Sequence, residues 1–237
     1  MNVCVLLAGG VGKRLGADKP KQFVELLGKP MIAYTMEIYE KSPLINALEV
    51  VCVKEYIDYV WQIAKENNIT KLKWVVPAGD SGQESAMNGV FALEGILKDD
   101  DILFEAMAVS PLIDDEVIED AINVCKKYGN AVSAEYPPTY FPLKVTGDKE
   151  SSKPISRKEI ALCQMPMVTT YGKALEMYKR GQKDNVCMGD QNHIITLLMH
   201  YGEPVHFSKW SRKNIKITTK EDIELFKAYL QLNKENK

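Results

Sequence analysis

Residues 3–16, with the sequence VCVLLAGGVGKRLG, decide the fold class. The apolar run over residues 3–7 is typical of a strand that is buried on both faces of a sheet. Gly9, Gly10 and Gly12 follow this run directly, and glycines at such a turn let backbone N–H groups face a ligand. The stretch therefore predicts a buried strand that leads into an anion-binding turn.

The first half of the chain repeats this alternation of strand and helix. We expect further strands at residues 48–53, 72–76, 101–104 and 131–134, and helices at residues 30–39, 56–64, 85–97 and 115–128. This spacing predicts an α/β fold with a doubly wound, mostly parallel sheet and helices on both faces. Such sheets bind ligands at the carboxyl ends of their strands, which points to the loops after Leu7, Val76 and Phe104.

Residues 136–161 interrupt the alternation. Pro137 and Pro138 lie near their start, and residues 141–145 and 154–160 flank a turn at Gly147, so we expect a hairpin arm that projects from the domain. A disordered loop is the alternative. Beyond the arm, the sequence predicts helices at residues 173–178 and 193–201, strands at residues 204–207 and 215–217, and a last helix that begins with a capping box at Thr219. We interpret residues 1–237 as a single domain.

Composition excludes several classes of partner. The 237 residues carry 30 Lys and Arg against 32 Asp and Glu, a formal net charge of −2. No general basic surface for nucleic acid is expected, and no apolar run approaches the roughly 18 residues of a membrane span. Five scattered cysteines without a C-x-x-C pair favour a reducing cytoplasm over a disulfide framework or a zinc site. The three histidines match no nucleophilic triad, and we interpret His193, His200 and His206 as ordinary helix and strand residues.

The glycine turn matches neither of two common phosphate-binding motifs. Four basic residues accompany it, namely Lys13, Arg14, Lys19 and Lys21. A Walker A loop would need Gly in place of Leu7 and a hydroxyl residue directly after Lys13, and a dinucleotide fingerprint would need Gly in place of Leu15. A tight turn with solvated charges is the simplest alternative.

The wider pattern resembles the cytidylyltransferases that act on 2-C-methyl-D-erythritol 4-phosphate or ribitol 5-phosphate. LAGGxGxRLG at residues 7–16, followed by PKQF at residues 20–23, is similar to the opening signature of this family. Residues 78–89 are similar to its GGxxRxxSVxNG segment, and residues 214–222 to its NxKITTPED ending. Arg157 precedes Gln164 by seven residues, as in the family's R-x6-QTPQ stretch, so the resemblance covers nearly the whole chain.

The resemblance implies a Rossmann-like nucleotidyltransferase fold and an enzyme that joins CTP to a small polyol or sugar phosphate, for an isoprenoid precursor or a surface polymer. It implies that Arg14, Lys21 and Lys216 are catalytic, because they would neutralise charge on the triphosphate. The implied nucleotide-binding residues are Ala8, Gly9, Gly10, Gly12, Gly79, Asp80 and Ser85. Arg157 would contact the acceptor phosphate across a homodimer interface formed by the arm. The alternatives are that Lys216 and Arg157 are plain surface charges and that Ser85 caps a helix.

The chain departs from the family pattern on the metal and acceptor sides. Met107 stands where the family has an aspartate that helps to hold Mg²⁺, and Ser110 replaces an arginine. Mg²⁺ is still expected by resemblance, with Glu105 and Asp190 as alternative carboxylates and no assigned ligand. These departures favour an acceptor other than methylerythritol phosphate. A non-catalytic homologue that binds nucleotide as a regulatory subunit is the second hypothesis, and an enzyme for another nucleoside triphosphate is the third.

Overall fold

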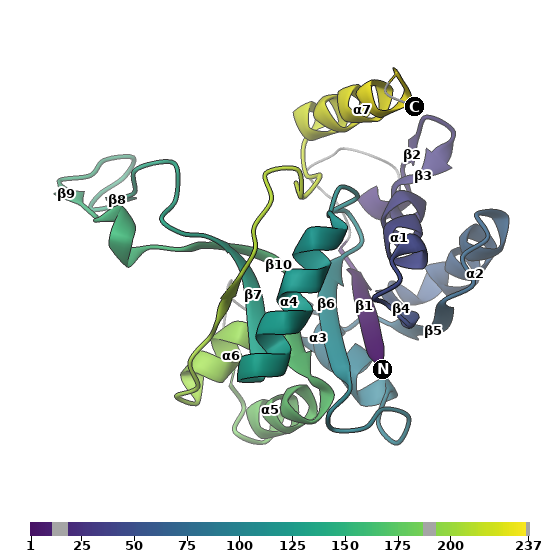
Figure 1. The fold of residues 1–237 in the computed structure, drawn as a ribbon, viewed down its shortest axis with the longest axis horizontal. Coiled ribbons are helices and arrows are strands. Elements are labelled where there is room, and N and C mark those ends of the chain that lie inside the picture. Colours follow the sequence, from purple (N-terminus) through teal and green to yellow (C-terminus); the bar gives the residue numbers. More distant parts are fainter. Residues whose placement is uncertain (11–18, 187–192, 236–237) are drawn as a thin grey trace.

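The computed structural model describes the chain except residues 11–18, 187–192 and 236–237. Its centre is a seven-stranded sheet in the order β11-β7-β10-β6-β1-β4-β5 (Figure 1). The strands are β1 (Asn2–Ala8), β4 (Ala47–Cys52), β5 (Leu72–Pro77), β6 (Ile102–Met107), β7 (Asn130–Glu135), β10 (Leu162–Thr170) and β11 (Phe207–Ser208). Two short hairpins complete the strands, one of β2 (Glu25–Leu26) with β3 (Lys29–Pro30) and one of β8 (Leu143–Lys144) with β9 (Lys153–Pro154).

The expected mostly parallel sheet is confirmed. Strand β1 pairs in parallel with β4 and β6, and β4 pairs in parallel with β5. Strand β10, which the sequence analysis did not predict, runs antiparallel between β6 and β7. Its register shifts between Gln164 and Met167, around Pro166. Proline within a strand is tolerated at such irregularities. Because proline normally argues against a strand, the sequence pattern did not predict β10.

Helices cover both faces of the sheet (Figure 1). One face packs against α1 (Met31–Lys41), α2 (Ile57–Glu66) and α4 (Asp115–Tyr128), and the other against α3 (Gly82–Ala92), α5 (Tyr171–Lys183) and α6 (Ile194–His200). Strand β1 alternates between them, since Cys4 and Leu6 join the first apolar cluster whereas Val3 and Val5 join the second. None of the helices in the described ranges combines the length and apolar character that a bilayer crossing requires.

Within the described ranges, short 3₁₀ helices also connect these elements, namely Lys21–Phe23, Lys54–Tyr56 and Arg157–Glu159. The first follows the glycine turn and the second follows β4, so both lie near the carboxyl ends of the parallel strands. The third lies on the arm, beside the hairpin of β8 and β9 (Figure 1). Its N-cap is Ser156, whose hydroxyl accepts a hydrogen bond from the Lys158 backbone.

Two buried carboxyl groups lie in the second apolar cluster, on either side of Val5. Val5 is in register with Glu49 on β4 and with Glu105 on β6. Both oxygens of Glu49 lack a hydrogen-bond partner among the described residues, and burial raises its pKa to about 8. Burial also raises the pKa of Glu105 to about 7, although the Tyr178 hydroxyl donates a hydrogen bond of 2.9 Å to it.

Helices α3 and α1 begin at other residues than the sequence predicts, because their N-caps differ from the expected ones. Helix α3 begins at Gly82 rather than at Ser85, because the Ser81 hydroxyl accepts a hydrogen bond from the Glu84 backbone and completes a capping box. Helix α1 begins just after Pro30, which is its N-cap rather than its first residue. The expected box at Thr219 is present in α7 (Lys220–Glu235), where Asp222 accepts from the Thr219 backbone at 2.8 Å.

The segment before α7 is extended chain rather than the expected strand at residues 215–217. One backbone hydrogen bond of 2.9 Å, from Ile217 N to Val109 O, ties it to the end of β6. Ile217 and Phe226 then bury their side chains in a small cluster with Leu26 and Met31. This cluster holds the C-terminal segment against the carboxyl end of the sheet.

The segment between β7 and β10 leaves the body of the molecule, as the expected arm does (Figure 1). Its hairpin, β8 with β9, is shorter than predicted. Several large apolar side chains of the arm are exposed to solvent, with Tyr140 at 76% and Phe141 at 80%. Such exposure is unusual for large aromatic residues and marks a surface suited to contact with another chain.

Candidate active site

A cavity of about 880 Å³ lies at the carboxyl ends of β1, β4, β5 and β6. The loops after Leu7 and Val76 and the end of β6 line it, as the parallel sheet led us to expect. Residues 53–55, after β4, also line it and were not anticipated. Its described lining is Leu7, Ala8, Gly9, Gly10, Lys21, Gln22, Val53, Lys54, Glu55, Ala78, Gly79, Asp80, Ser81, Gly82, Ser85, Met107, Val109, His193, Lys216 and Thr218.

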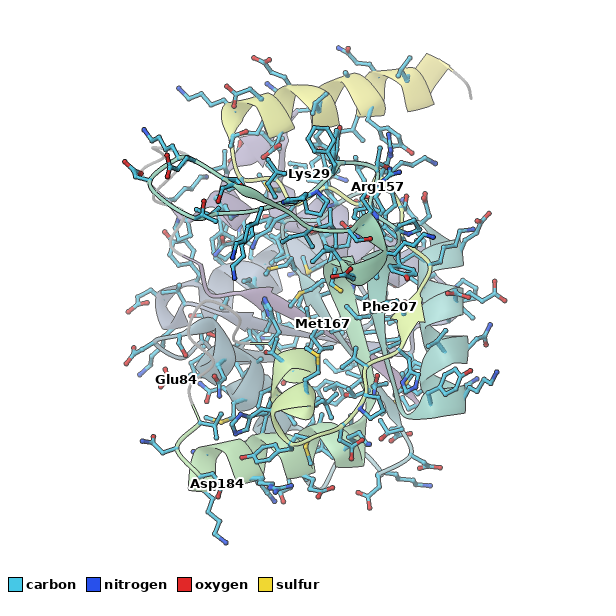
Figure 2. The ribbon with its side chains drawn as sticks, turned by 90° about the vertical axis from the view of Figure 1, so that its left-hand side faces the viewer. Lys29, Glu84, Arg157, Met167, Asp184 and Phe207 are labelled. Carbon is cyan, nitrogen blue, oxygen red and sulfur yellow. The ribbon has the colours of Figure 1, made fainter. Side chains whose placement is uncertain are left out.

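Most of the residues selected by resemblance meet at this cavity. Ala8, Gly9, Gly10, Lys21, Gly79, Asp80, Ser85 and Lys216 all line it. Arg14 and Gly12 lie outside the described residues. Arg157 lies on the arm and lines neither this cavity nor the second one described below (Figure 2). The sequence motifs thus converge in space, while the roles assigned to their residues stay predictions.

Gln22 fixes the start of the glycine turn and was missed as a site residue. Its side chain is buried, and its amide nitrogen donates hydrogen bonds to the carbonyl oxygens of Ala8 and of Gly10, the latter at 3.1 Å. The signal was present, since Gln22 is the third residue of the PKQF motif. Its polar side chain next to Phe23 is buried because the turn supplies acceptors for it.

Gly9 is required by the close approach of two loops. A Cβ atom on Gly9 would lie 2.6 Å from Ala78 Cβ and 3.2 Å from Ser85 Oγ. Any larger residue would therefore push the first loop away from the one that follows β5. Both loops line the cavity, so the glycine at this contact sets the spacing between them.

Ser85 holds the second loop together rather than capping α3. Its hydroxyl accepts a hydrogen bond from Gly79 N at 3.1 Å and donates one to Ser81 O at 2.8 Å. The Asp80 backbone donates to Glu84 Oε2 at 2.8 Å. The N–H groups of Gly79 and Asp80 are thus already bonded within the loop, and the alternative of Ser85 as the helix cap is wrong.

Lys21 and Lys216 reach the cavity from opposite ends of the sequence. Lys21 donates a hydrogen bond of 3.0 Å from Nζ to the carbonyl oxygen of Ile217, the neighbour of Lys216. Both lysines therefore line the same cavity, although 195 positions separate them in the chain. Two cations at the carboxyl end of a parallel sheet form a local site for a polyphosphate, which the near-zero net charge conceals.

A second cavity of about 480 Å³ adjoins the first. Met107, His193 and Lys216 line both cavities and so form the junction between them. The other residues of the smaller cavity are neutral: Ser110, Ala161, Cys163, Gln164, Met165, Met167, Ile195, Thr196, Met199 and Asn214. A cavity with neutral hydrogen-bonding walls and a cation at one end suits a small hydroxylated molecule with one charged end.

Asn214 leaves an unsatisfied acceptor at the smaller cavity. Its side chain is 4% exposed, and its amide nitrogen donates a hydrogen bond of 2.7 Å to Met165 O, which fixes the orientation of the amide. Its carbonyl oxygen, Oδ1, has no partner among the described residues. A buried acceptor without a donor is costly, so a ligand hydroxyl that donates to it would bind favourably.

His193 lies at the start of a helix, as expected, but it also lines both cavities, which the sequence did not predict. It is the N-cap of α6, and its backbone N–H donates a hydrogen bond of 3.2 Å to Thr196 Oγ1. Burial lowers the pKa of its imidazole, and the nearby charge of Lys216 lowers it further. No motif in the sequence marks this histidine, because only the fold brings it to Lys216.

The described residues do not fit a protein-held Mg²⁺. The acidic residues of the larger cavity are Glu55 and Asp80, while Met107 at the end of β6 offers a thioether, which Mg²⁺ does not take as a ligand. Glu105 lies in the apolar core, and Asp190 falls outside the described residues. Within the described ranges, no three His, Cys, Asp or Glu residues form a group that could hold a metal ion.

Comparisons with known proteins agree with this geometry. The family described as 2-C-methyl-D-erythritol 4-phosphate cytidylyltransferase matches residues 2–232. A ribitol-5-phosphate cytidylyltransferase of Lacticaseibacillus paracasei is 38% identical over 98% of both chains. A 2-C-methyl-D-erythritol 4-phosphate cytidylyltransferase of Clostridium acetobutylicum is 30% identical over 98% of this chain and 99% of that one. The crystal structure of a 4-diphosphocytidyl-2C-methyl-D-erythritol synthase from Anaerococcus prevotii shares the fold, with a TM-score of 0.80 at 19% identity over 98% of this chain and 96% of that one.

The match extends over nearly the whole chain, and it includes both ends of the sequence that meet at the larger cavity. The chain therefore belongs to the 2-C-methyl-D-erythritol 4-phosphate cytidylyltransferase family and is a nucleotidyltransferase.

Proposed function

We propose that this enzyme transfers the cytidylyl group of CTP to ribitol 5-phosphate. The observation that carries the proposal is the pair of adjoining cavities, with Lys216 at their junction. Relatives named for ribitol 5-phosphate are 34–38% identical to this chain, whereas relatives named for methylerythritol phosphate are 28–31% identical. The products would be CDP-ribitol and pyrophosphate.

In this reaction an oxygen of the acceptor phosphate attacks the α-phosphorus of CTP. The bond from the α-phosphorus to the oxygen that bridges to the β-phosphate breaks, and pyrophosphate leaves with that oxygen. A phosphomonoester is largely ionised at neutral pH, so the attack requires no general base. The difficulty is the approach of one anion to another, which the ammonium groups of Lys21 and Lys216 reduce. No step requires the protein to hold Mg²⁺; an ion carried in on the phosphates of CTP remains a prediction.

The larger cavity suits CTP. Its volume of about 880 Å³ and its placement between the glycine turn and the loop after β5 leave room for a nucleoside triphosphate. Gly9 lets the glycine turn and the loop after β5 pack closely at one end of this cavity, and Lys21 lines the part where the phosphates would gather.

The smaller cavity suits the polyol chain. Ribitol 5-phosphate carries four hydroxyl groups, and the cavity offers the unsatisfied Oδ1 of Asn214 to one of them. Gln164 is held in place by a hydrogen bond of 3.1 Å from its amide nitrogen to Ser211 O, so its carbonyl oxygen can serve a second hydroxyl. Methionines fill the remaining wall and adapt to the carbon chain.

The proposal is tested by following pyrophosphate release from CTP with a panel of phosphorylated polyols. We expect turnover with ribitol 5-phosphate and a kcat/KM for it at least about tenfold above that for methylerythritol phosphate, as the loss of one hydroxyl contact would give. A preference for methylerythritol phosphate would contradict the acceptor. CTP binding without pyrophosphate release for any acceptor would instead favour the non-catalytic homologue.

We further propose that the arm joins two copies of the chain and that Arg157 acts in the site of the partner copy. Within one chain, Arg157 is exposed, its guanidinium donates to Thr139 O at 3.4 Å, and in Figure 2 it lies well away from Met167 in the smaller cavity. The exposed Tyr140 and Phe141 supply an apolar contact surface on the same arm. The cytoplasmic location remains a prediction from cysteine usage.

Sedimentation and kinetics test this arrangement together. We expect a dimer for the unmodified protein, a monomer with weak activity for Phe141→Ser, and a dimer with a raised acceptor KM for Arg157→Ala. Lys158→Ala is the matched control, because Lys158 is the exposed neighbour of Arg157. A fully active monomer would overturn the proposal.

A further inference from the structure

His193 occupies a position that the activity described so far does not use. It lies at the junction of the two cavities together with Lys216, which is the point where the acceptor phosphate must meet the α-phosphate of CTP. Its main chain is fixed at the start of α6 by the hydrogen bond to Thr196. The backbone of His193 therefore has a defined place where the two cavities adjoin.

The charges around this position favour an anion. Lys216 supplies the cation whose field reaches His193, and the described lining of the smaller cavity contains no acidic residue. The acidic residues in the described lining of the larger cavity are Glu55, within the 3₁₀ helix that follows β4, and Asp80, in the loop after β5. Neither of them lines the smaller cavity, so a phosphate dianion there meets no described carboxylate.

We propose that His193 binds the acceptor phosphate beside Lys216 and takes up a proton as the phosphate dianion enters. This inference rests on the proposed function, because it assigns the phosphate of that acceptor to the junction. It makes His193 a substrate-binding residue that selects phosphorylated polyols over free ones. The step forms no covalent bond; the imidazole gains one proton from solvent, and the pair becomes imidazolium and phosphate dianion.

The free enzyme is prepared for this step. Burial and the charge of Lys216 both lower the pKa of the imidazole, so the ring is neutral at pH 7 in the absence of substrate. A phosphate dianion within hydrogen-bond distance reverses the field and raises that pKa. Binding is then coupled to proton uptake, and acceptor affinity gains from His193 as the pH falls toward the pKa of the imidazole in the complex.

Kinetics of His193→Gln against the unmodified enzyme test the inference. We expect the acceptor KM to rise about tenfold near pH 6.5, because the variant loses one charge-assisted hydrogen bond to the phosphate. The KM for CTP should stay within about twofold of its value in the unmodified enzyme. The ratio of the two acceptor KM values should shrink toward pH 8.5. This ratio cancels the ionisation of the phosphate itself, which affects both proteins equally.

His200→Gln is the matched control, since His200 is an exposed histidine at the other end of the same helix. A ratio that does not change with pH, or an equal rise in the KM for CTP, would overturn the inference. If turnover is absent in the unmodified enzyme with every acceptor, the proposed function fails instead.

A second measurement does not depend on a variant. Calorimetric titration of the unmodified enzyme and CMP with ribitol 5-phosphate, in two buffers of different ionisation enthalpy near pH 7, should reveal net proton uptake on binding. CMP fills the nucleotide site without permitting turnover. Binding without proton uptake would contradict the role of His193.

Discussion

Lys216→Ala is expected to lower kcat by a factor of about 10²–10³. Lys216 lines both cavities, and in the proposed reaction negative charge accumulates between them as the acceptor oxygen approaches the α-phosphorus. Removing one preorganised cation at such a point removes stabilisation that the transition state uses more than the bound substrates do. The KM values should therefore change much less than kcat. Steady-state pyrophosphate release at saturating CTP and acceptor measures the effect.

Lys213→Ala is the matched control for this experiment. Lys213 lies three positions earlier in the same segment, is exposed, and pairs with Asp114 at 3.6 Å without lining either cavity. Its loss should leave kcat within about twofold, as is usual for a surface ion pair. Lys216→Arg keeps the charge and should retain more activity than the alanine variant. Equal kcat values for Lys216→Ala and Lys213→Ala would remove Lys216 from the catalytic machinery.

Thermal stability is expected to fall as the pH rises from 5 to 8.5, and Glu49→Gln is expected to weaken this dependence. Burial raises the pKa of Glu49 to about 8, so the folded chain holds a proton that the unfolded chain releases near its ordinary pKa. A group of this kind contributes stability that is complete below the unfolded pKa and is lost as the pH rises through the folded one. Glu105, with a pKa of about 7, acts in the same direction.

The expected loss is several kcal/mol between these pH values, or on the order of 10 °C in melting temperature. Glutamine keeps the shape of the side chain and remains neutral, so Glu49→Gln should melt well above the unmodified protein at pH 8.5 and close to it at pH 5. Melting curves across this range provide the measurement. Glu224→Gln, at an exposed position of α7, is the control. Parallel curves for Glu49→Gln and the unmodified protein would show that Glu49 is ionised in the fold at pH 5.

The sequence was sufficient for those parts of the fold that local pattern determines. The apolar run over residues 3–7 and the glycines after it identified β1 and the turn at the cavity. Alternating strands and helices identified the parallel sheet, since each short apolar run was bounded by turn residues. The resemblance to the family implied that Lys21 and Lys216 act at one site, and both residues line the larger cavity.

The parts that escaped prediction depend on contacts between distant segments. Strand β10 contains Pro166 beside a register shift, and only its partners β6 and β7 define it as a strand. Asn214 is a polar residue in an extended segment, and its unsatisfied oxygen becomes visible only when Met165 packs against it. His193 needed the fold to bring α6 beside Lys216. Each of these sites is a property of the packed molecule rather than of a local window.

The hydrogen bond from Lys21 to the carbonyl oxygen of Ile217 also shows when the larger cavity can form during synthesis. A ribosome that adds about 5–20 residues per second needs roughly 10–40 seconds to travel from the first of these residues to the second. Throughout that interval the glycine turn exists without Lys216. A chain released before residue 216 would contain every described strand of the central sheet and yet lack the lysine that lines both cavities, so these cavities are completed only near the end of synthesis.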